Sequence, residues 1–152
     1  MMKLISSLLF SLILLNTNFA NAAVFSIEDA HVRATPPHSQ NSAAFMKIHN
    51  SSDISRKLIT VSSDIAERVE LHSHIMSDGM MKMRQVEAIE VDANGTAILR
   101  PGSFHVMFLG LKSPLVEGEN VRLRLYFDNG DEITIDAPIK KITTKKKMKH
   151  NQ

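Results

Sequence analysis

Apolar and polar residues alternate along much of the chain between residues 30 and 140, with the period of two that is typical of β-strands. The clearest runs are 68–74, 120–127 and 132–135, and the last two flank a hairpin-turn sequence, Asp128-Asn129-Gly130-Asp131. Further short extended stretches lie at 30–33, 43–49, 57–61, 80–91, 96–100 and 105–111. About seven to nine strands at close spacing, with room for one helical turn at 63–68, predict an all-β antiparallel sandwich or Greek-key barrel.

The first 22 residues do not share this alternation. Lys3 is followed by an apolar run over 4–15 and by Ala20-Asn21-Ala22, a small-x-small cleavage sequence, so we expect a signal peptide over 1–22. About a dozen apolar residues are too few to span a bilayer, which takes roughly 20. We therefore expect cleavage near Ala22-Ala23, export to the periplasm and no stable membrane insertion afterwards.

Charge divides the rest of the chain in two. Lys and Arg number 18 against 16 Asp and Glu, but six of the lysines lie beyond the last acidic residue, Asp136. Without those six and Lys3, 11 basic residues face 16 acidic ones. The basic character belongs to the tail, which argues against nucleic-acid binding as the function of the exported domain. We expect one domain over 23–139 and a disordered lysine-rich tail over 140–152.

Soft metal ligands are spaced regularly in the middle of the chain. Ten residues separate His72 from Met83, 21 separate Met83 from His105, and one separates His105 from Met107. The chain has no cysteine, which excludes a disulfide, a lipid-bearing cysteine and a thiolate ligand. Histidine and methionine are therefore the soft donors that this sequence offers.

The sequence from His72 to Met83 predicts a hairpin that brings these two residues to one face. A turn at Ser77-Asp78 places His72 opposite Met83, and a turn at Asp78-Gly79 places it opposite Gln85 with Met83 diagonal. In both registers the two side chains share a face about 5–8 Å apart. The same parity holds for His74, Met76 and Met81, which, with the nearby Met80, are candidates for transient ligands.

His105 and Met107 also share a strand face, because they are two positions apart, while Phe104, Val106 and Phe108 point to the opposite, core side. If the fold brings the two pairs together, the site holds two imidazoles and two thioethers. Thioether sulfur is neutral and soft, and it favours Cu(I) over zinc. A blue-copper redox centre needs a cysteine thiolate, so this donor set indicates storage or transfer of Cu(I).

The H-x10-M-x21-H-x-M spacing, with DGMMKMR and PGSFHVMFLGL around it, resembles the periplasmic copper chaperone family PCuAC over nearly the whole domain. The resemblance implies a cupredoxin-like β-sandwich that binds one Cu(I) per chain through His72, Met83, His105 and Met107. It also implies delivery of copper to a recipient, either the copper centre of cytochrome c oxidase or a Sco-type assembly factor. Some relatives have a His- and Met-rich extension for Cu(II), but this tail offers only Met148 and His150, and we do not transfer that second site.

Other interpretations remain open. The chain could buffer copper or confer copper tolerance instead of delivering the ion, or it could be an immunoglobulin-like interaction module without a metal. We expect no enzyme, because no G-x-S-x-G, no H-E-x-x-H and no cysteine nucleophile occurs, and we expect a monomer. The remaining residues with potential ligand side chains are assigned to the core, to strand ends or to loops: Met46, His31, His38 and His49.

Overall fold

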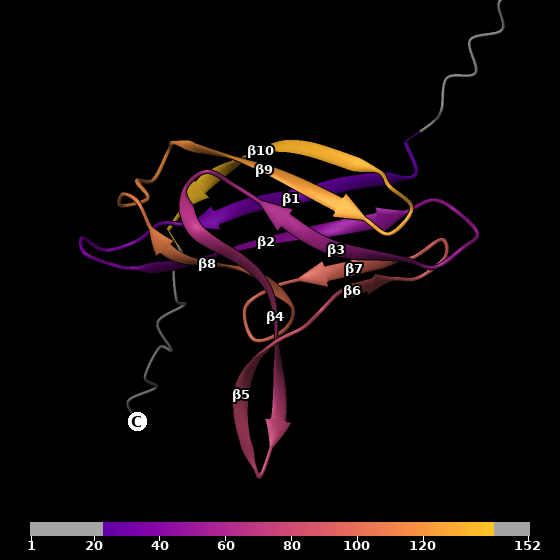
Figure 1. The fold of residues 1–152 in the computed structure, drawn as a ribbon, viewed down its shortest axis with the longest axis horizontal. Helices are drawn as coiled ribbons and strands as arrows, with labels where there is room; N and C mark the ends of the chain where they lie inside the picture. Colours follow the sequence, from indigo (N-terminus) through magenta and orange to yellow (C-terminus); the bar gives the residue numbers. More distant parts are fainter. Residues whose placement is uncertain (1–22, 142–152) are drawn as a thin grey trace, which may run out of the picture.

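The structure, a computed structural model, describes residues 23–141, and within them ten strands and no helix are found (Figure 1). The strands are β1 Phe25–Arg33, β2 Asn41–Asn50, β3 Arg56–Ser62, β4 Ala66–Ser77, β5 Met80–Gln85, β6 Ile89–Val91, β7 Thr96–Leu99, β8 His105–Leu111, β9 Asn120–Phe127 and β10 Glu132–Lys140. The predicted all-β class is confirmed.

Two sheets form the sandwich. Sheet A has the order β5-β4-β8-β2-β1, and β7 follows β8 along the same edge of β2. Sheet B has the order β10-β9-β3-β6. The sheets are joined where β1 and β10 run parallel, with Val32 opposite Ile139, and every other strand pair in the described residues is antiparallel. The antiparallel sandwich is confirmed, apart from this one pair.

The core lies between the two sheets and fixes which way each strand faces. On β9 every second side chain is buried, and Phe127 stacks on Phe25 with 3.7 Å between ring centroids. From sheet A, Val106 and Phe108 of β8 enter the same core and are fully buried. Each such side chain contributes about 1.5–3 kcal/mol through burial. Because β8 alternates, its inward valine and phenylalanine leave His105 and Met107 on the outer face of sheet A.

Two strand predictions need correction because local irregularities break the alternation. β1 begins at Phe25, not at residue 30, since Asp29 has a positive φ of 53° and the pairing with β2 shifts between Glu28 and His31. Such a bulge interrupts the period of two on which the prediction depended. The stretch 80–91 is two strands, because the chain leaves β4 after the Val86 N–H donates to the Leu71 carbonyl and then joins β3 of the other sheet.

The helical turn predicted at 63–68 is wrong. β4 begins at Ala66, and Arg68 already lies opposite Leu109 of β8. Ala66 is buried in the core, so this segment is fixed by sheet pairing and packing instead of by local helix hydrogen bonds.

The predicted signal peptide and most of the predicted tail, residues 1–22 and 142–152, lie outside the described residues. β10, the last strand, ends at Lys140. A search of residues 23–141 for a helix long and apolar enough to cross a membrane finds none.

Candidate metal site

The outer face of sheet A brings together ligands from distant parts of the sequence. β4 pairs with β8 so that His72 lies directly opposite His105 and Glu70 opposite Met107. On the other side of β8, Met107 lies opposite Ala43 of β2. Directly opposed residues of antiparallel strands share a face, so His72, His105 and Met107 all point outward from the same part of the sheet.

The β4–β5 hairpin adds Met83 to this face. Its two-residue turn is Asp78-Gly79, with φ values of 54° and 74°, as in the type I′ turns that suit the twist of a hairpin. Of the two registers considered above, the structure has the one with His72 opposite Gln85. Met83 is therefore diagonal to His72 and directly opposite His74.

A pocket of about 220 Å³ opens on this face. Four soft donors line it, His74, Met83, His105 and Met107, together with Arg33, Ala43, Phe45, Pro101 and Gly102. Ala43 and Phe45 are buried but do not belong to the central core, so they form the apolar wall of the pocket. Two larger hollows elsewhere in the described residues, of about 280 and 350 Å³, are lined by no histidine or methionine.

His105 is held in a form that can bind a metal. The residue is 3% exposed, and its Nδ1 lies 3.0 Å from the Ser103 carbonyl oxygen. A carbonyl only accepts hydrogen bonds, so Nδ1 carries the proton and Nε2 keeps its lone pair. Burial lowers the pKa of His105 below its ordinary value, and the nearby His74, His72 and Arg33 act in the same direction, against the Ser103 hydrogen bond. The neutral imidazole that a metal needs is therefore favoured.

His72 has the opposite tautomer. Its Nε2 donates to a Glu70 carboxylate oxygen at 2.8 Å, while its Nδ1 is buried and has no hydrogen-bond partner. A buried polar atom without a partner is costly, and a metal ion is one way to satisfy it. The carboxylate–imidazole pair is also the usual support of a metal-binding histidine. The ring centroid of His72 lies 5.8 Å from that of His105, but His72 does not line the pocket.

Met83 lies at the base of a hairpin that is rich in exposed sulfur. Figure 1 shows β4 and β5 extending away from the two sheets. Met83 is 44% exposed, and Met76, Met80 and Met81 nearer the turn are exposed still further. Met76 lies opposite Met81 on the face of His74 and Met83, which confirms the predicted parity. Within residues 23–141, no group of three or more His, Asp or Glu side chains gathers as a metal held by nitrogen and oxygen alone would require.

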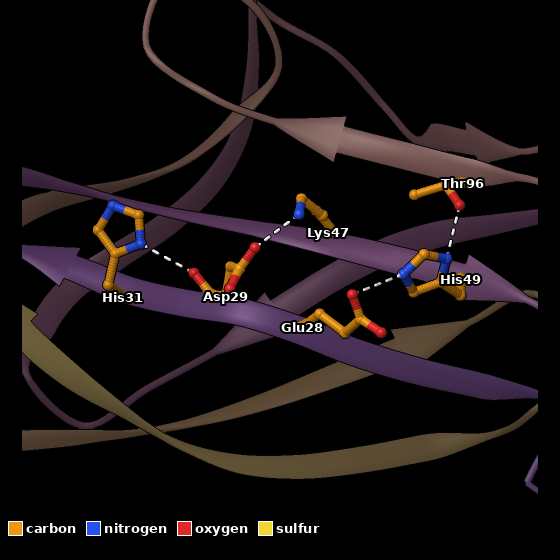
Figure 2. A network of polar contacts seen from close by, with 6 residues as sticks. All are labelled: Glu28, Asp29, His31, Lys47, His49 and Thr96. Atoms are coloured by element: carbon orange, nitrogen blue, oxygen red, sulfur yellow. Dashed lines mark hydrogen bonds and ion pairs between the residues drawn. The ribbon is translucent and has the colours of Figure 1, made fainter.

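The histidines left out of the spacing have other neighbours. Figure 2 shows a polar network on β1, β2 and β7 in which His49 Nδ1 lies 2.6 Å from the Thr96 hydroxyl and Nε2 lies 3.1 Å from Glu28. In the same network His31 Nδ1 donates to the backbone carbonyl of Asp29 at 2.9 Å. Met46 is 2% exposed and belongs to the core, as predicted.

Sequence reasoning overlooked two supporting groups, Glu70 and the Ser103 carbonyl. Glu70 was detectable, since a carboxylate two positions before His72 on a strand shares its face. Ser103 was not, because a backbone carbonyl is placed by the loop geometry between β7 and β8 and carries no sequence signal.

Comparison with known proteins places the chain in a family. A family model described as "Putative lipoprotein LpqE-like" matches residues 25–139. The protein Lxx21020 of Leifsonia xyli subsp. xyli is 28% identical over 99 residues, which cover 64% of this chain and 60% of that protein. The chain thus spans less than two thirds of the length of this curated relative. The match supports an exported protein, although this sequence has no cysteine that could carry a lipid.

Solved structures agree with the fold. The solution structure of CuI-DR1885 from Deinococcus radiodurans is 33% identical, with a TM-score of 0.65 over 82% of this chain and 85% of that chain. The copper-bound PCuAC domain from PmoF2 has a TM-score of 0.67 over 78% of this chain and 94% of that chain, at 24% identity, and supports the fold alone. The chain belongs to the LpqE-like family and has the fold of the PCuAC domains, which confirms the resemblance drawn from its sequence.

Proposed function

We propose that the protein is an extracytoplasmic copper chaperone that binds one Cu(I) through His72, Met83, His105 and Met107. The observation that carries the proposal is the donor arrangement on the outer face of sheet A. His105 offers a free Nε2 and His72 an unpartnered, buried Nδ1, and strand pairing puts both residues on the same sheet face as Met83 and Met107. The 33% identical DR1885, whose structure was solved with Cu(I), supports copper as the ion.

The surroundings of the site favour a monovalent ion. The proposed donors are neutral, and Arg33 lines the pocket and acts electrostatically on His105. A nearby positive charge repels Cu(II) about twice as strongly as Cu(I) at the same distance. Sulfur donors select Cu(I) for a second reason, which is their softness.

The degree of exposure indicates transfer as the purpose. Met83 is 44% exposed on the projecting hairpin, while His105 is buried at the start of β8. A recipient can approach the ion from the hairpin side and displace an exposed thioether first. We infer that the recipient is a periplasmic copper protein, either a cytochrome c oxidase subunit or a Sco-type assembly factor, and that the chaperone acts as a monomer.

The test is an anaerobic titration of the exported protein with Cu(I) against a chromophoric chelator. A variant with alanine at His72, Met83, His105 and Met107 serves as its control. We expect one tight equivalent in the natural protein and none in the variant, with both β-sheet circular dichroism spectra alike. Equal, weak binding by both proteins would contradict the proposal and favour a metal-free interaction module.

A deletion experiment in cells distinguishes copper delivery from copper buffering. If the protein delivers copper, its deletion lowers cytochrome c oxidase activity, and added copper restores the activity. Deletion that leaves the oxidase unaffected and only makes the cells sensitive to copper would show buffering instead.

A further inference from the structure

A third imidazole, His74, lies beside the proposed site although it is outside the four-residue spacing. It is directly opposite Met83, and its ring centroid lies 5.3 Å from that of His105. The corresponding distance from His72 to His105 is 5.8 Å, even though these two are cross-strand partners. The diagonal neighbour is therefore closer to His105 than the residue directly opposite.

The pocket includes His74 and leaves His72 out. Met83, His105 and Met107 of the proposed site line it, and the β4 histidine among its lining residues is His74. An ion in this pocket has His74 at its wall, while His72 is turned toward Glu70.

The hydrogen bonds of His74 prepare it in the same way as His105. Nδ1 of His74 lies 3.5 Å from the Ser103 carbonyl oxygen, the same atom that accepts from Nδ1 of His105 at 3.0 Å. The carbonyl fixes the proton of His105 on Nδ1, and the longer contact favours the same tautomer in His74, with a lone pair on Nε2. His72 differs, since its proton is on Nε2 and its lone pair on Nδ1. β4 thus offers two imidazoles with opposite tautomers, two positions apart.

The two β4 histidines do not join His105 as a single set of three ligands. Among residues 23–141, no group of three or more histidine or acidic side chains is gathered closely enough to hold one metal ion. Each of them is near His105 separately. This arrangement indicates that they act as alternatives to each other.

We propose that His74 is a second, exchangeable imidazole ligand for copper, which replaces His72 while His105, Met83 and Met107 keep the ion. The inference rests on the proposed Cu(I) site. In the exchange, the bond from Nε2 of His74 to copper forms and the bond from Nδ1 of His72 breaks. Copper stays Cu(I), and no proton is released, because both donor nitrogens are already unprotonated. His74 is two residues closer to the hairpin turn than His72. The exchange therefore moves copper toward the exposed Met76–Met81 pair.

The test is a double-mutant cycle on Cu(I) affinity with His72→Gln, His74→Gln and the double variant, measured by anaerobic chelator competition. If the two imidazoles replace each other, each single variant loses less than about tenfold, and the double variant loses more than about 100-fold, far beyond the product of the two. His49→Gln is the matched control and leaves the affinity unchanged. The inference is overturned if His74→Gln has no effect and the double variant equals His72→Gln.

A direct readout uses the imidazole nitrogens. In the His72→Gln protein, long-range ¹H–¹⁵N spectra should show the Nε2 resonance of His74 shifting on addition of one equivalent of Cu(I), with no shift for His49. An unchanged His74 Nε2 at saturation would overturn the inference. Should His72→Gln fail to fold, the natural protein is observed in the same way with His74→Gln as its reference.

His105→Ala separates this inference from the proposed function. If His105→Ala also binds Cu(I) like the natural protein, the copper site itself is wrong. If His105→Ala abolishes tight binding, while His74→Gln changes the Cu(I) affinity of neither the natural protein nor the His72→Gln variant, only the role of His74 is wrong.

Discussion

His49 lies at one end of β2 and His105 lies beside the middle of that strand, and the two rings differ in what surrounds their nitrogens. At one end, His49 has a hydroxyl beside one nitrogen and a carboxylate beside the other (Figure 2). Beside the middle of β2, His105 and His74 each use one nitrogen for a backbone carbonyl, and the other nitrogen makes no such bond. The pocket that these two histidines line is also lined by Met83 and Met107, whose thioethers do not compete as strong hydrogen-bond partners.

The difference shows that a histidine becomes a metal-ligand candidate through its partners. One hydrogen bond from Nδ1 or Nε2 fixes the tautomer and leaves a lone pair on the other nitrogen. Nε2 of His49 also makes no hydrogen bond, but the Glu28 carboxylate lies 3.1 Å from it, so its neighbour is a charged oxygen and not a sulfur. The part of the outer face of sheet A that carries His74, Met83, His105 and Met107 is called the soft-donor face below. The polar network around His49 can serve as an internal reference for it, because a change in one region can be compared with a matched change in the other.

The largest effect is expected when His105 or Met107 is removed from the soft-donor face. His105→Ala or Met107→Ala should weaken Cu(I) binding more than about 100-fold, because loss of a ligand exceeds the 10–100-fold typical of changes in supporting residues. Chelator competition measures the loss, with His49→Ala as the control in the polar network. If the copper-free His105→Ala protein melts far below the natural protein, the residue has a core role instead.

The next effect tests the parity of the hairpin. Lys82 and Met83 point to opposite faces, so the exchange Lys82→Met with Met83→Lys keeps the composition and moves one thioether to the wrong side. Cu(I) affinity should fall about 10- to 100-fold, less than on loss of the buried His105, because Met83 is exposed and Met81 offers a second thioether on the same face. Met80→Ala, which removes an exposed methionine from the opposite face, should leave the affinity unchanged. Equal binding by the exchanged variant would contradict the role of Met83.

A smaller effect concerns the stability of the copper-free protein in acid. Because burial holds the pKa of His105 below its ordinary value of 6.5, the unfolded chain takes up this proton as the pH falls through 6.5, while the folded chain resists it. The free energy of unfolding should therefore be fully retained above pH 6.5 and decrease below it. Urea unfolding at several pH values measures the slope, which should be flatter in His105→Gln. An identical slope in both proteins would contradict the assignment to His105.

The smallest effect comes from the polar network. Thr96→Val removes the hydroxyl that lies 2.6 Å from His49 but keeps the β-branched shape suited to a strand. At this exposed position the loss should be about 0.5–1 kcal/mol in the free energy of unfolding, with no change in Cu(I) affinity. A change in affinity would show that the two regions are coupled.

The sequence alone predicted which ligands share a strand face, but not that the two pairs of ligands come together. Parity placed His72 with Met83 and His105 with Met107, and the Asp78-Gly79 turn limited the hairpin to two registers that agree on the face. The pairing of β4 with β8, which sets His72 opposite His105, depends on long-range contacts that a local pattern does not contain. For the same reason the sequence could not rank His74 against His72, since their distances to His105 depend on loop and ring geometry.

Irregular backbone limited the prediction of the fold in a similar way. The bulge at Asp29 reverses the alternation within β1, and the departure of the chain after Gln85 divides one extended stretch between two sheets. Both features arise where pairing between distant strands overrides the alternation of apolar and polar residues. The central residues of each strand were therefore predictable, but its ends were not.

The exposure of Met83 also bears on chemical damage. A methionine that is 44% exposed on a projecting hairpin is accessible to oxidants, and oxidation to the sulfoxide replaces a soft sulfur ligand by a polar, hard oxygen. Met46, buried in the core of the same protein, is shielded from this reaction. An oxidised hairpin would keep the fold and lose its preference for Cu(I), and reduction of the sulfoxide by a methionine sulfoxide reductase would restore it.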